Sequence, residues 1–128
     1  MDGLRRLVLL GQAGFYVVMG AWPMIDVTSF ETVTGPKSDH WLVQTVGLLA
    51  VAIGASLLVG VWRMQPSRET LTLAVTTAIA FLSIDVVFVL RRAISAIYLV
   101  DAGVEALFLL ILAATFRAPA ARARSVPK

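Results

Sequence analysis

Three acidic residues lie inside long apolar stretches of this sequence, where carboxyl groups are rare. Asp85 falls in the third apolar stretch, and Asp101 and Glu105 fall in the fourth. An acid in the middle of a bilayer costs several kcal/mol unless it is paired, neutralised or hydrated. These three residues are therefore the first candidates for binding a ligand, carrying a proton or catalysing a reaction.

The spacing of these acids predicts that they gather in one place. Asp101 and Glu105 are four residues apart and share a helix face, and Tyr98 joins that face three residues earlier. If the third and fourth stretches form a hairpin that turns near Ala93, Asp85 and Asp101 lie at similar depth. Glu105 then lies about one turn deeper.

Two arginines follow the third stretch. Arg92 is seven residues after Asp85, so both can occupy one helix face, and the long arginine side chain can fold back into the bundle. We expect Arg91 or Arg92 to pair with one of the two aspartates. The predicted ligand or proton site thus comprises Asp85, Arg91, Arg92, Tyr98, Asp101 and Glu105, with a lid formed by Asp39, His40 and Trp41.

Three roles for this cluster stay open. Pairs between acids and arginines can simply hold helices together. The cluster can bind a ligand, an ion or a proton, or two acids can act as general acid and base. With no cysteine and one histidine, His40, the sequence predicts no metal site, and it assigns no catalytic residue and no cofactor. Gln12 and Gln44 are expected to make hydrogen bonds between helices.

The composition identifies the class of protein. Of the 128 residues, 59% are apolar and 15% charged, whereas a soluble domain has about 45–50% and about 25%. The chain has too little polar surface to cover a water-soluble globule. This excludes a soluble enzyme, a disordered protein and a free nucleic-acid-binding domain. The lipid bilayer is the expected partner, and nucleic acid is not.

The apolar residues form four stretches, each near the roughly 20 residues that a membrane-spanning helix needs. They cover residues 7–25, 41–62, 71–90 and 94–116. The fold class predicted is all-α, an integral membrane bundle of four transmembrane helices. We expect one domain over residues 1–116 and a basic cytoplasmic tail over residues 117–128.

Local signals mark the ends of these helices. Thr28–Glu31 has a capping-box pattern, which predicts a short amphipathic helix in the first, outer loop. Ser38 or Asp39 is expected to cap the second spanning helix, Ser67 the third and Ser95 the fourth.

Basic residues predict the orientation. With both termini inside, the inner side carries eight of them: Arg5, Arg6, Arg63, Arg68, Arg117, Arg122, Arg124 and Lys128. The outer side carries three, namely Lys37, Arg91 and Arg92. This bias follows the positive-inside rule. The first stretch also has the charge pattern of a signal peptide, but no small-residue cleavage site follows it, so we expect it to remain as a helix.

Small residues recur in the second stretch. Ala50 and Gly54, and likewise Ser56 and Gly60, are four residues apart. This spacing favours close helix packing, either within a bundle or between two copies of the chain.

The region from residue 14 to residue 58 resembles small bacterial four-helix membrane proteins of the broad DoxX-like kind. It reads GFYVVMGAWP, then SFETVTGPKSDHWLVQTVG, then IGASLL. The shared pattern is a first helix ending near a proline, an outer loop and a glycine-containing second helix. The resemblance implies a bacterial inner-membrane protein that serves as an accessory subunit of membrane oxidoreductase complexes. It transfers no catalytic motif to this chain.

Three functions are compatible with these features. The first is a non-enzymatic accessory or interaction protein that holds a lipid-like or quinone-like ligand in an outer-leaflet polar pocket, with a membrane protein or a second copy as partner. The second is an oligomeric proton-coupled transporter or channel that uses Asp101 and Glu105. The third is a membrane-embedded lipid-modifying enzyme.

Overall fold

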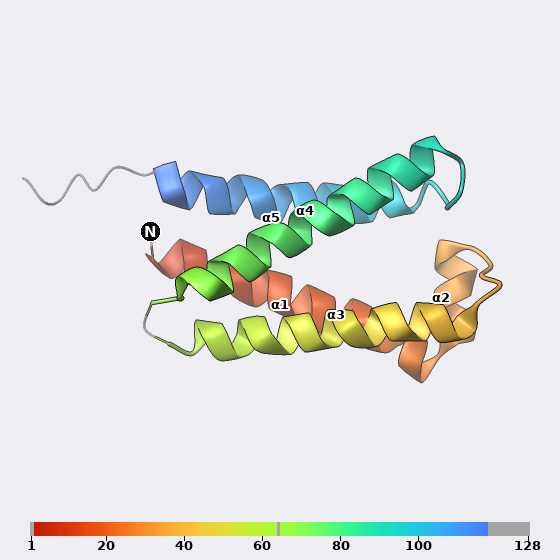
Figure 1. Ribbon diagram of the computed structural model, residues 1–128, viewed down its shortest axis with the longest axis horizontal. Helices are drawn as coiled ribbons and strands as arrows, with labels where there is room; N and C mark the ends of the chain where they lie inside the picture. The colour runs from red at the N-terminus through yellow and green to blue at the C-terminus, as the bar shows by residue number, and fades with distance from the viewer. Residues whose placement is uncertain (1, 64, 118–128) are drawn as a thin grey trace, which may run out of the picture.

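The computed structural model describes residues 2–63 and 65–117, and this part of the chain is helical without strands. Its helices are α1 (Asp2–Ile25), α2 (Val27–Thr34), α3 (His40–Val61), α4 (Arg68–Leu90) and α5 (Tyr98–Arg117) (Figure 1). The predicted all-α fold is confirmed. Most of the expected basic tail, residues 118–128, lies outside the described residues.

Four of these helices, α1, α3, α4 and α5, are long and apolar enough to cross a membrane. Large side chains such as Leu7, Leu49 and Leu110 point outward and are more than half exposed. An apolar surface of this extent belongs in hydrocarbon rather than water. The chain is therefore a multi-pass membrane protein.

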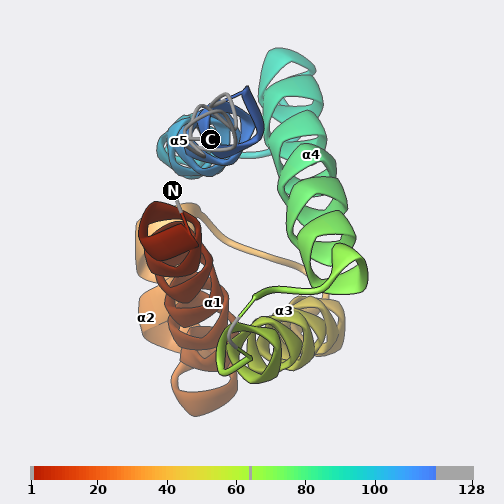
Figure 2. The same ribbon diagram turned by 90° about the vertical axis from the view of Figure 1, so that its left-hand side faces the viewer.

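The four long helices form a ring in the order α1, α3, α4, α5, seen along the bundle in Figure 2. Successive long helices run in opposite directions, and α2 lies across one end. At the other end are the N-terminus of α1 and the loop between α3 and α4 (Figure 1). We call the half beneath α2 and the 91–97 loop the open half, and the opposite half the closed half.

Glycines allow α1 and α3 to pack at backbone contact. A Cβ atom at Gly54 would lie 2.7 Å from the carbonyl oxygen of Ala13, and one at Gly20 would overlap the carbonyl oxygen of Gly47. Of the small residues expected to pack a bundle or a dimer, Ala50 and Gly54 thus contact α1 of the same chain, Gly60 contacts Thr70 of α4, and Ser56 is exposed.

The closed half contains the apolar core. Leu9, Leu57 and Leu112 are fully buried there. Arg5 ties α1 to the end of α5, because its Nε and Nη2 atoms donate to Oγ1 and the carbonyl oxygen of Thr115, each at 3.2 Å. This contact also satisfies a carbonyl that the helix end leaves free.

Most predicted helix ends agree with the structure within a few residues, but α1 begins at Asp2 rather than at residue 7, and the capping of α2 and α3 differs in detail. Ser67 caps α4 as expected, by accepting from the Thr70 N–H at 3.2 Å. However, α2 is capped by Asp26, which accepts from the Ser29 N–H, rather than through Thr28. Asp39 occupies the cap position of α3 without a side-chain hydrogen bond.

The start of α5 differs as well, because this helix begins at Tyr98 rather than at residue 94. The Ser95 hydroxyl accepts from the Ile97 N–H at 3.4 Å, and its carbonyl accepts from the Tyr98 N–H at 3.1 Å. These bonds belong to a turn. Arg92 within the same loop has φ of 60°, so the chain reverses through a left-handed residue before α5 can begin.

We expect Gly54→Ala to lower the melting temperature clearly, because overpacking of this kind costs about 1–3 kcal/mol. Gly14→Ala is the matched control, since no atom outside its helix lies within 4 Å of the added Cβ. The control should keep or slightly raise stability, because alanine favours a helix over glycine. Thermal unfolding of both variants in mild detergent checks this, and equal melting temperatures would contradict the packing argument.

Candidate functional site

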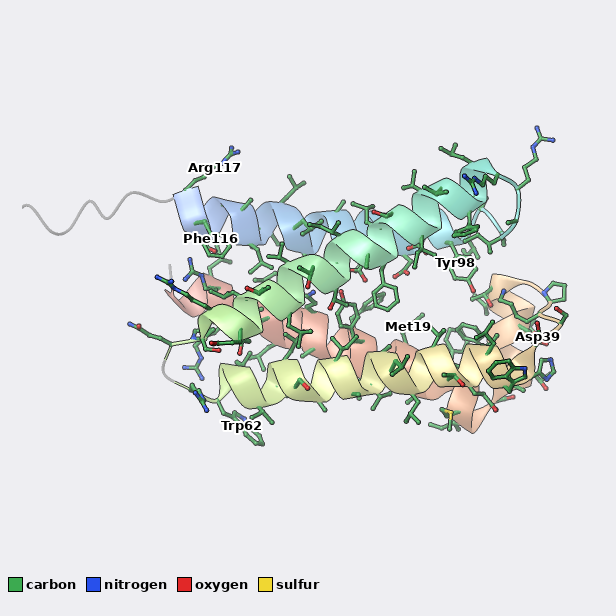
Figure 3. The ribbon with its side chains drawn as sticks, viewed as in Figure 1. Met19, Asp39, Trp62, Tyr98, Phe116 and Arg117 are labelled. Carbon is green, nitrogen blue, oxygen red and sulfur yellow. The ribbon has the colours of Figure 1, made fainter. Side chains whose placement is uncertain are left out.

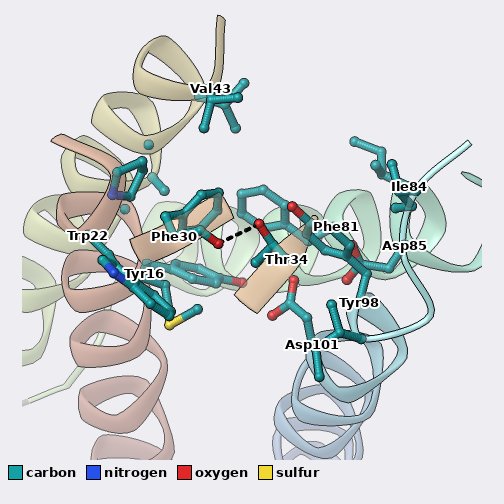
Figure 4. Close-up of a pocket in the computed structure, with 18 of the residues that line it drawn as sticks. Tyr16, Trp22, Phe30, Thr34, Val43, Phe81, Ile84, Asp85, Tyr98 and Asp101 are labelled. Carbon is teal, nitrogen blue, oxygen red and sulfur yellow. Dashed lines mark hydrogen bonds between the residues drawn. The ribbon is translucent and has the colours of Figure 1, made fainter. Parts of the chain in front are cut away.

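The open half contains a cavity of about 710 Å³, bounded by all five helices. Aromatic and aliphatic side chains form most of its wall, and Asp85, Asp101 and Glu105 all line it (Figure 4). Tyr98 lines it as well. The structure thus brings together four of the six residues predicted to form the site.

Glu105 is fixed by a buried chain of hydrogen bonds that joins three helices. The Gln12 amide nitrogen donates to the Ala74 carbonyl at 2.8 Å and to the Tyr16 hydroxyl at 3.0 Å. Tyr16 in turn donates to Oε2 of Glu105 at 2.7 Å. The Ala74 carbonyl can only accept, so it determines which end of the amide faces it. Both amide hydrogens are then used, and the tyrosine proton points to Glu105.

This chain lies where the closed half meets the cavity. Gln12 is fully buried and does not line the cavity, whereas Tyr16 and Glu105 do. The expected interhelical role of Gln12 is therefore observed. Sequence reasoning did not identify Tyr16, although its position four residues after Gln12 on one helix face was an available signal.

Asp85 and Asp101 approach the cavity from different helices. Asp85 comes from α4 and Asp101 from α5, and both lie on the same side of the cavity (Figure 4). Asp85 is only 3% exposed, and within the described residues its Oδ2 atom has no hydrogen-bond partner. A buried acceptor without a donor is costly in an apolar surrounding. It is an acceptor that a ligand can satisfy.

The predicted ion pair between an arginine and an aspartate is not formed, so that expectation was wrong. Arg91 and Arg92 are exposed, and neither lines the cavity. Across residues 2–63 and 65–117, the structure has a single contact between basic and acidic side chains, His40 with Glu31. The α4 helix ends at Leu90 and Arg92 has a left-handed conformation, so the helical period that would place Arg92 on the face of Asp85 does not extend to it.

The predicted lid is also wrong. Asp39, His40 and Trp41 are exposed and do not line the cavity. Figure 3 shows Asp39 at the end of the molecule, beyond the helices. His40 instead holds Glu31 of α2, with Nε2 and Oε1 2.7 Å apart.

The cover of the cavity is α2 with the residues that follow it. Phe30 and Thr34 of α2, and Lys37 beyond it, line the cavity. Trp22 anchors this cover, because its Nε1 donates to the Ser29 hydroxyl at 2.8 Å and its ring meets Phe30 edge-on at 5.4 Å. The amphipathic helix that the sequence predicted at the interface therefore packs onto the bundle.

Lys37 places a positive charge at the mouth of the cavity. Its ammonium group donates to the carbonyl oxygens of Thr34 at 3.2 Å and Gly35 at 3.1 Å. It also lies 5.1 Å from the centre of the Tyr98 ring, within range of a cation–π interaction. These contacts hold the lysine at the rim.

The acids are not arranged as a metal centre. In the described part of the chain, no three residues among His, Asp and Glu are placed to hold one ion. The cavity instead offers an apolar volume with separate carboxyl groups on its wall, an arrangement suited to an organic molecule.

Comparison with protein-family models, curated proteins and solved structures gives no match for this chain. The resemblance to DoxX-like proteins stays a prediction, and the geometry of the cavity is the basis for a functional proposal.

We expect Tyr16→Phe to destabilise the protein by about 1–3 kcal/mol, since it leaves a carboxyl oxygen and an amide hydrogen without partners in a buried place. Tyr98→Phe is the control. Within the described residues the Tyr98 hydroxyl makes no hydrogen bond, and the ring that contacts Lys37 is kept in the variant. Thermal unfolding in detergent measures both. A Tyr16→Phe variant as stable as its control would show that the chain of bonds contributes nothing.

Proposed function

We propose that this protein binds a lipid-like or quinone-like molecule in the open half of its bundle and acts as a non-enzymatic accessory or interaction protein of the inner membrane. One observation carries the proposal. A single cavity combines about 710 Å³ of largely apolar space with the carboxyl groups of Asp85, Asp101 and Glu105. An apolar wall with a few polar groups that orient the ligand is the usual form of a small-molecule site.

The size of the cavity supports this proposal. Small-molecule sites commonly enclose about 300–1,000 Å³, and this cavity lies within that range. A molecule that is dissolved in the bilayer changes its surroundings little when it enters a cavity with an apolar wall. The polar groups of the cavity therefore determine which molecule is retained.

The closed half favours binding over conduction. Below Glu105, the buried side chains of Leu9, Leu57 and Leu112 fill the space between the helices. The cavity therefore ends inside the bundle. The alternative of a proton-coupled transporter requires that this core opens or that several copies build a path between them.

A lipid-modifying enzyme is a second candidate, favoured by one observation. Asp101 and Glu105 line the same cavity, as general acid–base catalysis on one substrate requires.

We further propose that the open half lies on the outer side of the inner membrane, with both termini inside. The closed half carries Arg5, Arg6, Arg63, Arg68 and Arg117, whereas the open half carries Lys37, Arg91 and Arg92. The positive-inside rule then places the closed half toward the cytoplasm. The cavity opens in the outer leaflet.

The binding proposal predicts that filling the cavity removes a bound molecule. Val104 lines the cavity, whereas Val59 of α3 is 59% exposed on the outer surface. We expect extraction and mass spectrometry of the purified protein to recover a molecule from the parent and from Val59→Trp, and at least tenfold less from Val104→Trp. Equal recovery from both tryptophan variants would contradict the proposal.

The same measurement separates binding from catalysis. A binding protein yields the same molecule from the parent and from Glu105→Gln. An enzyme that uses Glu105 yields its product from the parent and its unconverted substrate from the variant.

The proposed orientation predicts the labelling of single cysteines, for which this cysteine-free chain is a ready background. Ser38 and Gln65 are exposed in loops at opposite ends of the bundle. In spheroplasts, we expect a membrane-impermeant maleimide to label Ser38→Cys at once and Gln65→Cys only after permeabilisation. The reverse pattern would overturn the orientation.

A further inference from the structure

The hydrogen-bond donors of Tyr16, Trp22 and Thr34, which line the cavity, already have partners inside the protein. The Tyr16 hydroxyl donates to Glu105, and its own oxygen accepts from Gln12. Nearer the mouth, the Trp22 N–H donates to Ser29 and the Thr34 hydroxyl to the Phe30 carbonyl (Figure 4). Of the hydroxyl and indole donors that line the cavity, the Tyr98 hydroxyl alone has no hydrogen bond within the described residues. These side chains therefore have little to donate to a ligand.

The acceptors on the cavity wall are in surplus. Oδ2 of Asp85 is buried, and within the described residues no amide, amine or hydroxyl group donates to it; the polar side chain beside Asp85 is another carboxyl group, that of Asp101. Asp101 and Glu105 bring two more carboxyl groups to the same cavity. A ligand that satisfies this wall must bring hydrogen-bond donors of its own.

The three acids on the wall have no basic partner in the described part of the chain. No basic side chain within residues 2–63 and 65–117 lies within salt-bridge distance of these three acids. Lys37 lines the cavity, but its ammonium group is held at the rim by the carbonyl oxygens of Thr34 and Gly35. A carboxylate without a counter-charge is costly in an apolar surrounding, and a cation placed beside it removes that cost.

Aromatic rings surround the same space. Phe15, Tyr16, Trp22, Phe30, Phe81 and Tyr98 all line the cavity. The Tyr16 ring lies 5.4 Å from that of Phe81 and 6.2 Å from that of Phe15. Ring faces attract organic cations and also pack against apolar bodies. This wall suits a cationic amphiphile, because it can contact both the charged head group and the apolar body.

From these observations we infer that the ligand is a lipophilic amine in its ammonium form. Its N–H groups donate to Asp85, Asp101 and Glu105, and its apolar body lies among the aromatic rings. The inference rests on the proposed binding function and narrows it. It disfavours quinones, which bring acceptors alone, and fatty acids, which bring a like charge.

Three probes that share one body and differ in the head group test this inference. They are 4-(4-bromophenyl)butylamine, the corresponding alcohol and the corresponding carboxylate. Bromine quenches nearby tryptophan fluorescence, and Trp22 lines the cavity, whereas Trp41 and Trp62 are 68% and 79% exposed. The protein carries Trp41→Phe and Trp62→Phe and is placed in nanodiscs of zwitterionic lipid, so that Trp22 alone reports binding.

We expect saturable quenching by the amine, at least tenfold weaker binding of the alcohol and no saturable quenching by the carboxylate. Asp85→Asn keeps the shape of the side chain and removes its charge, and we expect it to weaken amine binding at least tenfold. Glu69→Gln is the matched control on α4, because Glu69 is exposed and does not line the cavity. Binding by this control should equal that of the parent.

The outcomes separate this inference from the function on which it rests. If the alcohol binds as tightly as the amine, or if a folded Asp85→Asn variant keeps full amine affinity, the inference fails and a binding cavity remains. If no probe gives saturable quenching and Val104→Trp retains the same molecule as the parent, the amine inference and the proposed binding function both fail. Should Asp85→Asn not fold, the comparison of amine and alcohol on the parent still decides the inference.

Discussion

The hydrogen bonds from Gln12 through Tyr16 to Glu105 are the constraint on which the rest of the structure depends. In hydrocarbon, a polar group without a partner costs several kcal/mol, so helices that carry such groups must meet where the groups can pair. Here the pairing brings together α1, the Ala74 carbonyl of α4 and Glu105 of α5. It fixes both the rotation and the depth of these helices, and it forms the floor of the cavity.

Above this floor the two helix pairs separate, and the cause lies in unequal packing. Glycines hold α1 against α3 at backbone distance along both halves of the bundle, as Gly20 with Gly47 and Gly54 with Ala13 show. The contact of α3 with α4 is tight near the closed end, where Gly60 meets Thr70. Toward α2 the same helices diverge (Figure 1), and side chains no longer fill the space between them. The result is a cavity with one closed end.

Basic and acidic side chains occupy different parts of the bundle. Basic side chains remain at the ends of the helices or at the rim, where water or lipid head groups reach them, whereas the acids of α4 and α5 face the interior. Glu105 is tied into the fold through Tyr16, and no basic side chain within the described residues pairs with Asp85 or Asp101. The unmatched acceptor at Asp85 is the observation that the proposed ligand would account for.

The sequence by itself determined the class, the number of spanning helices and the gathering of the acids. Apolar length dictates how many helices can cross a bilayer, and the helical period places Asp101 and Glu105 on one face. The similar depth of Asp85 and Asp101 also followed from the short connection between the third and fourth apolar stretches. Only the tertiary structure decided that Arg91 and Arg92 are exposed and do not line the cavity, because a left-handed residue in the turn has no helical period from which to predict it. It likewise decided that α2, rather than Asp39–Trp41, covers the cavity and that Tyr16 supports Glu105. Such contacts join residues far apart in the chain, and their geometry depends on how closely the glycines let the helices approach.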